Sequence, residues 1–169
     1  MTVRHGYTRT PVGDLMCAAE GDALIAVYFP RHERKPESGF GECVQVADDP
    51  VLARAAQQLG EYFAGERREF ELELAPRGEE FQKKVWKLLL DIPYGETTTY
   101  GAIARQLGDP GLAQAVGGAV GRNPVSIIVP CHRVIGSDGG LTGYAGGIER
   151  KIMLLDLEEP PERAAQKLF

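Results

Sequence analysis

Residues 123–136 read NPVSIIVPCHRVIG, an apolar run that ends in a proline, a cysteine, a histidine and an arginine. The run VSIIV at 125–129 is typical of a short segment buried in a protein core. A cysteine that follows such a run reacts only as a thiolate, which needs a base or a positive charge nearby. His132 and Arg133 are plausible sources of both, so Cys131 is a candidate nucleophile. Adjacency also permits a structural cysteine beside a surface histidine, and these residues alone leave both interpretations open.

Upstream of this stretch the sequence predicts three helices. The apolar residues of 79–90 fall mainly on one helical face, and Pro93 to Gly95 end that helix. TTTYGAIARQLG at 97–108 opens with a threonine cap and closes on a glycine. Asp109-Pro110 then caps a helix over 110–121. Two short helices joined by such a turn have the proportions of a helix-turn-helix.

The N-terminal half is predicted to be rich in β-structure. Strand-like residues separated by turn formers fall at 7–10, 15–19 and 24–29. Residues 30–49 are polar and contain several prolines and glycines, which is typical of a mobile loop. A helix capped by Asp49-Pro50 is expected to run to about residue 64. The alternating FELEL at 70–74 predicts a half-buried strand.

These elements predict an α+β chain with two parts. A β-sheet domain is expected over residues 1–76, with the loop at about 30–49 inside it. A helical domain over 77–158 carries the helix-turn-helix and the cysteine loop, and residues 159–169 form a tail.

Composition limits the function classes. The net charge of −5 and the pI of about 5.3 give no strongly basic footprint, so any binding to nucleic acid must come from a local surface. Cys17, Cys43 and Cys131 are odd in number and lack paired spacing, which disfavours disulfides and fits the cytoplasm. Scattered histidines and the lack of a CxxC predict no metal site. Neither a secretory signal nor a membrane span is expected.

The 123–136 segment and LTGYAGG at 141–147 together closely resemble the active-site region of the O6-alkylguanine-DNA alkyltransferase family. The asparagine eight residues before Cys131 and the tyrosine thirteen after it have the family's spacing. The resemblance continues through IPYGETTTYGAIA and AVGGAVGRNP and covers 79–158 closely. It implies a ribonuclease-H-like N-terminal domain and irreversible, single-turnover transfer of an alkyl group from O6-alkylguanine in double-stranded DNA to the protein.

The resemblance implies a role for four catalytic residues. Cys131 would accept the alkyl group, and His132 would take the thiol proton through a bound water. Glu158 would orient and polarise His132. Tyr100 would support the guanine ring and the charge that builds on it. No cofactor is implied.

The resemblance also implies a base pocket and a DNA surface. The pocket would be formed by Val134, Tyr144 and Ala145, supported by Lys151 and by Asn123 as a hinge whose side chain satisfies the backbone of a turn. Contact with the minor groove, after the base is flipped out, would involve Thr99, Gln114, Ala115, Gly117, Gly118 and Arg122. The protein would act as a monomer and without a membrane.

One position departs from the family pattern. Gln114 stands where the family usually has an arginine that enters the base stack, which predicts weaker duplex binding or slower flipping. Arg122 is not expected to substitute, because it lies about 80° round the helix from Gln114. Three alternatives remain at this point: a damage sensor without transfer activity, a thiol protein that acts on a small molecule, and a purely structural DNA binder. Sensors of this fold carry tryptophan in place of the cysteine.

Overall fold

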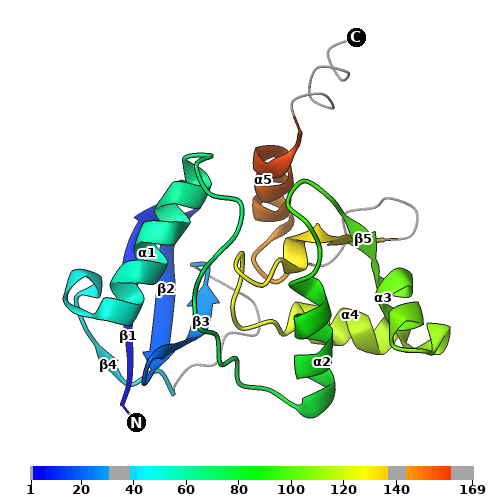
Figure 1. Cartoon of the computed structure of the whole chain (residues 1–169), viewed down its shortest axis with the longest axis horizontal. Coiled ribbons are helices and arrows are strands. Elements are labelled where there is room, and N and C mark those ends of the chain that lie inside the picture. The colour runs from blue at the N-terminus through cyan, green and yellow to red at the C-terminus, as the bar shows by residue number, and fades with distance from the viewer. Residues whose placement is uncertain (1, 31–38, 137–143, 161–169) are drawn as a thin grey trace.

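The computed structural model describes residues 2–30, 39–136 and 144–160. The N-terminal part is a four-stranded sheet with the order β3-β2-β1-β4 (Figure 1). Strands β1 (Val3–Thr10) and β2 (Gly13–Glu20) form a hairpin, and β3 (Ala23–Tyr28) pairs antiparallel with β2. Strand β4 (Glu42–Cys43) runs parallel to β1. The three strands expected from the sequence are therefore present; the first two are longer than predicted, and the third has the predicted length but begins one residue earlier.

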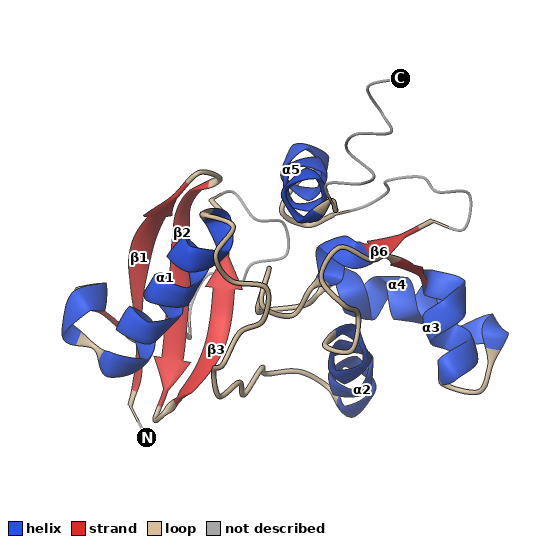
Figure 2. Cartoon of the chain, turned by 45° about the horizontal axis from the view of Figure 1, so that its top comes forward, coloured by secondary structure: helices blue, strands red, loops and turns tan. Residues whose placement is uncertain are grey.

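Both faces of this sheet are covered. Helix α1 (Pro50–Phe63) lies across one face, where it buries a stripe formed by Leu52, Ala55, Leu59 and Tyr62 (Figures 1 and 2). On the other face a smaller cluster contains Met16, Ile25 and Tyr28, with Phe40 packed against it. Asp49 caps α1 by accepting hydrogen bonds from the backbone N–H groups of Val51 and Leu52 at 3.0 and 3.1 Å, as the sequence predicted.

Part of the predicted loop has regular structure. Residues 31–38 lie outside the described residues, but β4 and the 3-10 helix Val46–Asp48 occupy its second half. Gly6 of β1 makes this possible, because a Cβ there would lie 2.7 Å from Cγ2 of Val46. The absence of a side chain at this position lets the segment pack directly on the sheet.

The strand predicted at 70–74 is wrong, apart from one isolated bridge between Leu74 and Leu24. The segment is extended, but the Gln58 side chain takes the place of a partner strand. Its amide accepts from Glu71 N–H at 2.9 Å and donates to Glu71 C=O at 3.2 Å. The alternating sequence of 70–74 predicted correctly which side chains are exposed. The backbone of Glu71, however, bonds to the side chain of Gln58 and not to a neighbouring strand.

The C-terminal part is helical. It contains α2 (Glu80–Leu89), α3 (Tyr100–Gln106), α4 (Ala113–Gly121) and α5 (Ile148–Glu158), with a 3-10 turn at Pro110–Leu112 that extends α4 backward. Strands β5 (Thr98–Thr99) and β6 (Val134–Ile135) pair in parallel. Helix α2 packs on α4 (Figure 2), and Trp86 Nε1–H donates to the carbonyl of Ala119 at 2.7 Å. The predicted helix-turn-helix is thus α3 and α4.

The edge of β3 joins the two parts. At its start, the Leu24 backbone bonds to Glu73 and Ala75 of the linker at 2.8 and 2.9 Å. Near its end, Val27 N–H donates to Pro124 C=O at 2.8 Å and Val27 C=O accepts from Ser126 N–H at 3.0 Å. The segment that precedes Cys131 therefore completes the sheet edge of the other domain, and one continuous core includes residues of both. None of the described helices is long and apolar enough to cross a membrane.

Candidate active site

The turn at 123–129 is held by Asn123. Its amide donates to Val129 C=O at 2.8 Å and to Val125 C=O at 3.4 Å, and its carbonyl oxygen accepts from Val125 N–H at 3.0 Å. Residues 123–130 are all buried, as expected for this apolar run. Ile127 has a φ of 72°, a conformation that β-branched residues rarely adopt. Asn123 thus ties the end of α4 to the residue just before Pro130 and Cys131.

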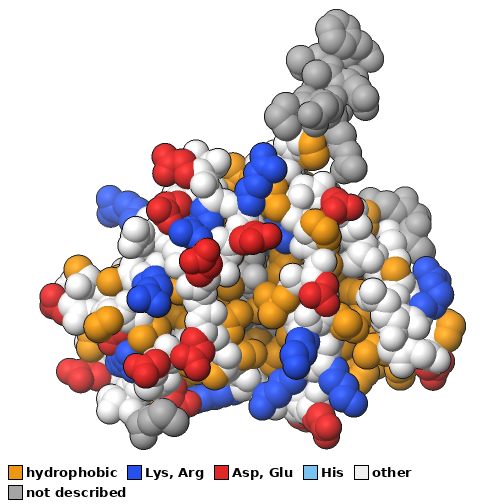
Figure 3. All heavy atoms as spheres, in the orientation of Figure 1, with side chains coloured by type: hydrophobic (Ala, Val, Ile, Leu, Met, Phe, Trp, Pro, Cys, Tyr) orange, Lys and Arg blue, Asp and Glu red, His pale blue; other side chains and the backbone are white. Residues whose placement is uncertain are grey.

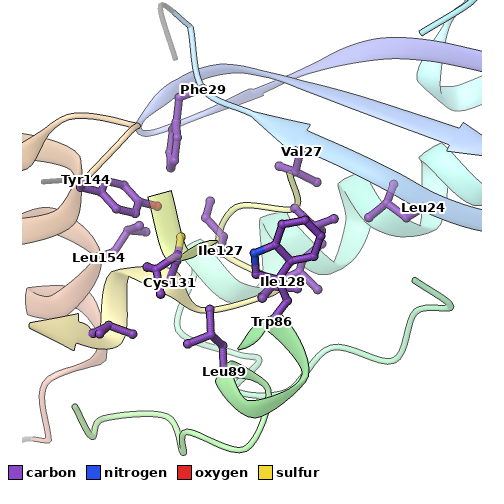
Figure 4. Close-up of a cluster of buried hydrophobic side chains, with 14 of the residues drawn as sticks. Leu24, Val27, Phe29, Trp86, Leu89, Ile127, Ile128, Cys131, Tyr144 and Leu154 are labelled. Atoms are coloured by element: carbon purple, nitrogen blue, oxygen red, sulfur yellow. The ribbon is translucent and has the colours of Figure 1, made fainter. Parts of the chain in front are cut away.

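Cys131 begins a short 3-10 helix, Cys131–Arg133, and is only 5% exposed. Figure 4 shows its sulfur among apolar side chains, with Tyr144 pointing toward it from the lead-in to α5. Burial raises the pKa of the thiol, while the side chains of Asn123 and Tyr144 and the charge of Lys151 oppose this rise. The thiol is therefore neutral at rest, and its reaction requires a group that takes the proton.

His132 and Glu158 form a buried pair. His132 Nε2 lies 2.7 Å from Glu158 Oε2, and the two side chains are 0% and 2% exposed. Burial opposes ionisation of Glu158, but the hydrogen bonds and charges of His132 and Arg133 outweigh it and lower the pKa of the carboxyl to about 2. An ionised carboxylate only accepts hydrogen bonds, so Nε2 must be the protonated nitrogen of a neutral His132.

This tautomer leaves Nδ1 as the basic nitrogen of His132. Nδ1 is buried and has no hydrogen-bond partner among the described residues. Burial lowers the pKa of the imidazole and outweighs Glu158, whose hydrogen bond and charge raise it, while Arg133 and Lys151 lower it further. The ring is consequently an unprotonated acceptor at neutral pH, one residue from the thiol. Because no described donor lies within hydrogen-bond distance of Nδ1, a proton from Cys131 can reach it through a bridging water.

Arg133 does not face the thiol, although the sequence suggested it as a source of positive potential. Its Nε donates to Glu158 Oε1 at 2.7 Å, Nη2 donates to Oε2 at 3.1 Å, and Nη1 donates to Ile92 C=O at 2.6 Å. The guanidinium also lies over the Tyr94 ring, 5.7 Å from its centre. Its charge therefore acts on the carboxylate that holds His132.

Lys151 supports the other side of the site. Its Nζ donates to the backbone carbonyl of Val134 at 2.7 Å, and the side chain is 1% exposed. Burial lowers the pKa of this amine, and the nearby Cys131 raises it. Val134 is fully buried and pairs with Thr98, which sets Thr99 and Tyr100 immediately beside the active-site loop.

The segment from Tyr144 to Gly147 closes the site. Tyr144 is buried and packs edge-on against Phe29 of the N-terminal domain, with 5.9 Å between the ring centres. Ala145 is half-buried. At Gly146 a Cβ would lie 2.4 Å from Phe29 Cδ2, so no side chain fits. Gly147 is different, because space is open there and its φ of 98° is what requires glycine. Residues 141–143 of the LTGYAGG motif lie outside the described residues.

The helix-turn-helix presents one face of α4. Gln114, Ala115 and Arg122 are exposed and the two glycines at 117 and 118 are half-buried. Ala119 of the same helix is buried against α2. The Tyr100 ring lies against α4, since a Cβ at Gly117 would be 3.8 Å from its Cδ1. Thr99 caps α3 by accepting from Ala102 N–H at 3.0 Å.

The structure thus brings together seven of the residues singled out in the sequence: Asn123, Cys131, His132, Val134, Tyr144, Lys151 and Glu158. The exposed residues of α4 form a separate surface. Sequence reasoning missed Tyr62 of α1, whose hydroxyl donates to Glu158 Oε2. Its spacing from Leu52, Ala55 and Leu59 indicates only a core position. No local pattern connects it to a residue 96 positions later.

A buried thiol next to an imidazole–carboxylate pair, beside a helix-turn-helix, defines a DNA-binding protein that reacts through its own cysteine. The comparisons with known proteins agree. The model of the 6-O-methylguanine DNA methyltransferase ribonuclease-like domain matches residues 3–76, and that of the DNA-binding domain of the same protein matches residues 80–160. The chain belongs to the 6-O-methylguanine DNA methyltransferase family.

Individual relatives cover nearly the whole chain. A methylated-DNA–protein-cysteine methyltransferase of Mycolicibacterium paratuberculosis is 59% identical over 168 residues, which are 99% of each chain. One from Mycobacterium tuberculosis is 49% identical over 160 residues, 95% of this chain and 94% of the relative. The crystal structure of Mycobacterium tuberculosis OGT in complex with DNA superposes with a TM-score of 0.81 at 46% identity, covering 95% of this chain and 97% of that one.

Proposed function

We propose that this protein repairs DNA by transferring the methyl group of 6-O-methylguanine to Cys131. The observation that carries the assignment to Cys131 is the neutral His132 beside it, held by an ionised and buried Glu158. The family and the DNA-bound relative support DNA as the partner. Cytoplasmic location is part of this proposal and is supported by three free cysteines, of which Cys43 is exposed.

In the proposed reaction His132 takes the thiol proton at Nδ1, through a water molecule. The thiolate of Cys131 then attacks the methyl carbon, a sulfur–carbon bond forms, and the bond from carbon to O6 breaks. The electron pair of that bond stays on the guanine, which takes up one proton and remains in the DNA as an undamaged base. The proton that His132 took from the thiol balances this proton. Tyr100 stabilises the charge that builds on the leaving base. The thioether consumes the nucleophile, so each molecule acts once. The acting species in this proposal is the monomer.

The remaining residues hold the base and the DNA in this proposal. Val134, Tyr144 and Ala145 line the pocket, while Asn123 and Lys151 fix its backbone. The damaged base must leave the duplex to reach a thiol that is 5% exposed, at a cost of a few kcal/mol. The exposed face of α4 with Gln114, Ala115, Gly117, Gly118 and Arg122 would enter the minor groove, with Thr99 at the flank.

The surface charge fits a local rather than a general attraction to DNA. Figure 3 shows basic and acidic side chains interspersed on the viewed face, with apolar side chains along the junction of the two domains. A net charge of −5 leaves little non-specific affinity for phosphate. Recognition therefore rests on α4 and on the flipped base.

The test is mass spectrometry of the intact protein and its peptides after incubation with a duplex that contains one 6-O-methylguanine. We expect a gain of one methyl group on the Cys131 peptide that stops at one equivalent. Cys131→Ser is the control and should bind the duplex without gaining mass. Binding of the duplex by the wild type without any transfer would identify a sensor. Loss of both would direct the search to small-molecule alkyl donors.

A further inference from the structure

Tyr62 crosses from one domain into the reaction centre of the other. It lies near the end of α1, is fully buried, and its hydroxyl donates a hydrogen bond to Glu158 Oε2. Its ring is packed by Phe63 at 5.2 Å, Phe70 at 5.6 Å and Tyr94 at 6.3 Å, measured between ring centres. These contacts fix where the hydroxyl lies.

Four donors from the described residues reach the carboxylate of Glu158, but they are divided unevenly between its two oxygens. An ionised carboxylate has about four lone-pair sites. Glu158 receives hydrogen bonds from Arg133 Nε on Oε1, and from Tyr62, His132 Nε2 and Arg133 Nη2 on Oε2. Tyr62, His132 and Arg133 Nη2 therefore share one oxygen. Each donor to an oxygen withdraws electron density from it and weakens its attraction for the others.

We infer that Tyr62 is a positioning residue for methyl transfer, which acts through Glu158 to keep His132 unprotonated. The inference rests on the proposed role of His132 as the base. A neutral donor on Oε2 disperses the charge of the carboxylate without adding charge of its own. Without that hydroxyl, Glu158 attracts the Nε2 proton more strongly and stabilises the imidazolium. His132 is then protonated at a higher pH and is lost as a base over a wider acidic range.

The other charged and titratable groups around the pair come from every element packed against it. In the described residues they are Tyr62 of α1, Tyr94 after α2, Cys131 and Arg133 of the 3-10 helix, Tyr144 before α5, and Lys151 of α5. Glu158 stays ionised from pH 5 to 9, because its pKa is about 2. Burial lowers the pKa of Lys151, and Cys131 raises it. The tyrosines stay neutral, because burial raises the pKa of Tyr62 and of Tyr144 above the ordinary value. A shift in the acidic limb therefore reports on His132.

The test uses Tyr62→Phe in the full chain, with Tyr94→Phe as the matched control. The hydroxyl of Tyr94 also lies against α5, but it donates to the backbone carbonyl of Leu157 at 3.3 Å and not to the carboxylate. Single-turnover transfer rates on the methylated duplex are measured from pH 5 to 9, together with duplex affinity and melting temperature. In Tyr62→Phe the acidic limb of the rate profile should move up by roughly half a pH unit to one unit. Duplex affinity should not change, and Tyr94→Phe should keep the wild-type limb.

A second probe covers the case in which Tyr62→Phe does not fold. Site-specific 3-fluorotyrosine at position 62 keeps the shape and makes the phenol a stronger donor, so the acidic limb should move down instead. An unmoved limb with either substitution, or a rate lowered equally at every pH together with a lower melting temperature, overturns the inference and leaves Tyr62 a packing residue. Failure of the wild type to methylate Cys131 would instead overturn the proposed function.

Discussion

His132 Nε2 lies 2.7 Å from Glu158 Oε2, although 26 residues separate them in the chain and both side chains are buried. The pair depends on α5, which follows the segment Tyr144–Gly147 and carries Glu158 at its last residue, next to the Cys131–Arg133 turn. Arg133 from the next position along the loop binds the same carboxylate and offsets its charge. The imidazole consequently stays neutral beside an anion, which is the state that a proton acceptor for Cys131 requires.

Glu158 should make folding stability depend on acid pH. Its pKa is about 2 in the folded protein against 4.5 for an ordinary glutamate, so its contribution is fully present above pH 4.5 and is lost as the pH falls toward 2. The whole contribution is about 3 kcal/mol. The free energy of unfolding, measured by urea denaturation from pH 7 to pH 2, checks this.

Glu158→Gln should remove that acid dependence and cost roughly 3–5 kcal/mol at pH 7, because Arg133 is left buried without its counter-ion. Glu149→Gln is the control, since Glu149 is exposed on the same helix and should change stability by less than about 0.5 kcal/mol. An acid dependence in Glu158→Gln equal to that of the wild type would show that another carboxyl is its source.

Gln114→Arg should strengthen binding to the duplex. Gln114 is exposed near the start of α4, and arginine adds a charge and a longer planar head at the position expected to meet the base stack. We expect a several-fold lower dissociation constant, a faster transfer rate, and a salt dependence of binding steeper by about one charge. Gln57→Arg adds the same charge on the exposed side of α1 and should leave the dissociation constant, the transfer rate and the salt dependence unchanged. Unchanged affinity and rate in Gln114→Arg would remove α4 from the flipping step.

Gly146→Ala should destabilise the closed site. Its Cβ would lie 2.4 Å from Phe29 Cδ2 and 2.8 Å from Tyr144 Cε2, and both rings are buried. Overpacking of this kind costs about 1–3 kcal/mol, and displacement of Tyr144 should also slow transfer. Gly60→Ala serves as the control, because nothing lies within 4 Å of its Cβ and α1 should gain about 0.5–1 kcal/mol. Denaturation of the two variants in parallel gives the answer, and equal stabilities would contradict the packing argument.

Methylated protein should melt below the unmodified protein. The Cys131 thiol is 5% exposed and packed among Ile127, Leu154 and Tyr144, so a methyl group there must displace its neighbours (Figure 4). A cost of about 1–3 kcal/mol corresponds to a fall of roughly 2–10 °C in melting temperature for a chain of this size. Calorimetry before and after one equivalent of methylated duplex measures it. Identical melting temperatures would mean that the site has room for the product.

Much of the secondary structure could be predicted from the sequence, because caps and turn residues act locally. Asp49, Thr99 and Asp109 each accept the backbone hydrogen bonds expected of a helix cap. The segment at 70–74 could not be predicted in the same way, because its backbone partner is the side chain of Gln58. Glu42–Cys43 pairs with β1 only because Gly6 leaves room nearby.

The sequence by itself determined the chemistry: a cysteine behind a buried run, a histidine beside it, and a helix-turn-helix upstream. It also determined the likeness to a family of DNA repair proteins. Tertiary structure alone decided which nitrogen of His132 is basic, what Arg133 does, and that Tyr62 shares the carboxylate of Glu158. The physical reason is range. Caps and turns are local, whereas the state of a buried charge depends on every donor that folding brings to it, and those donors come from distant parts of the chain.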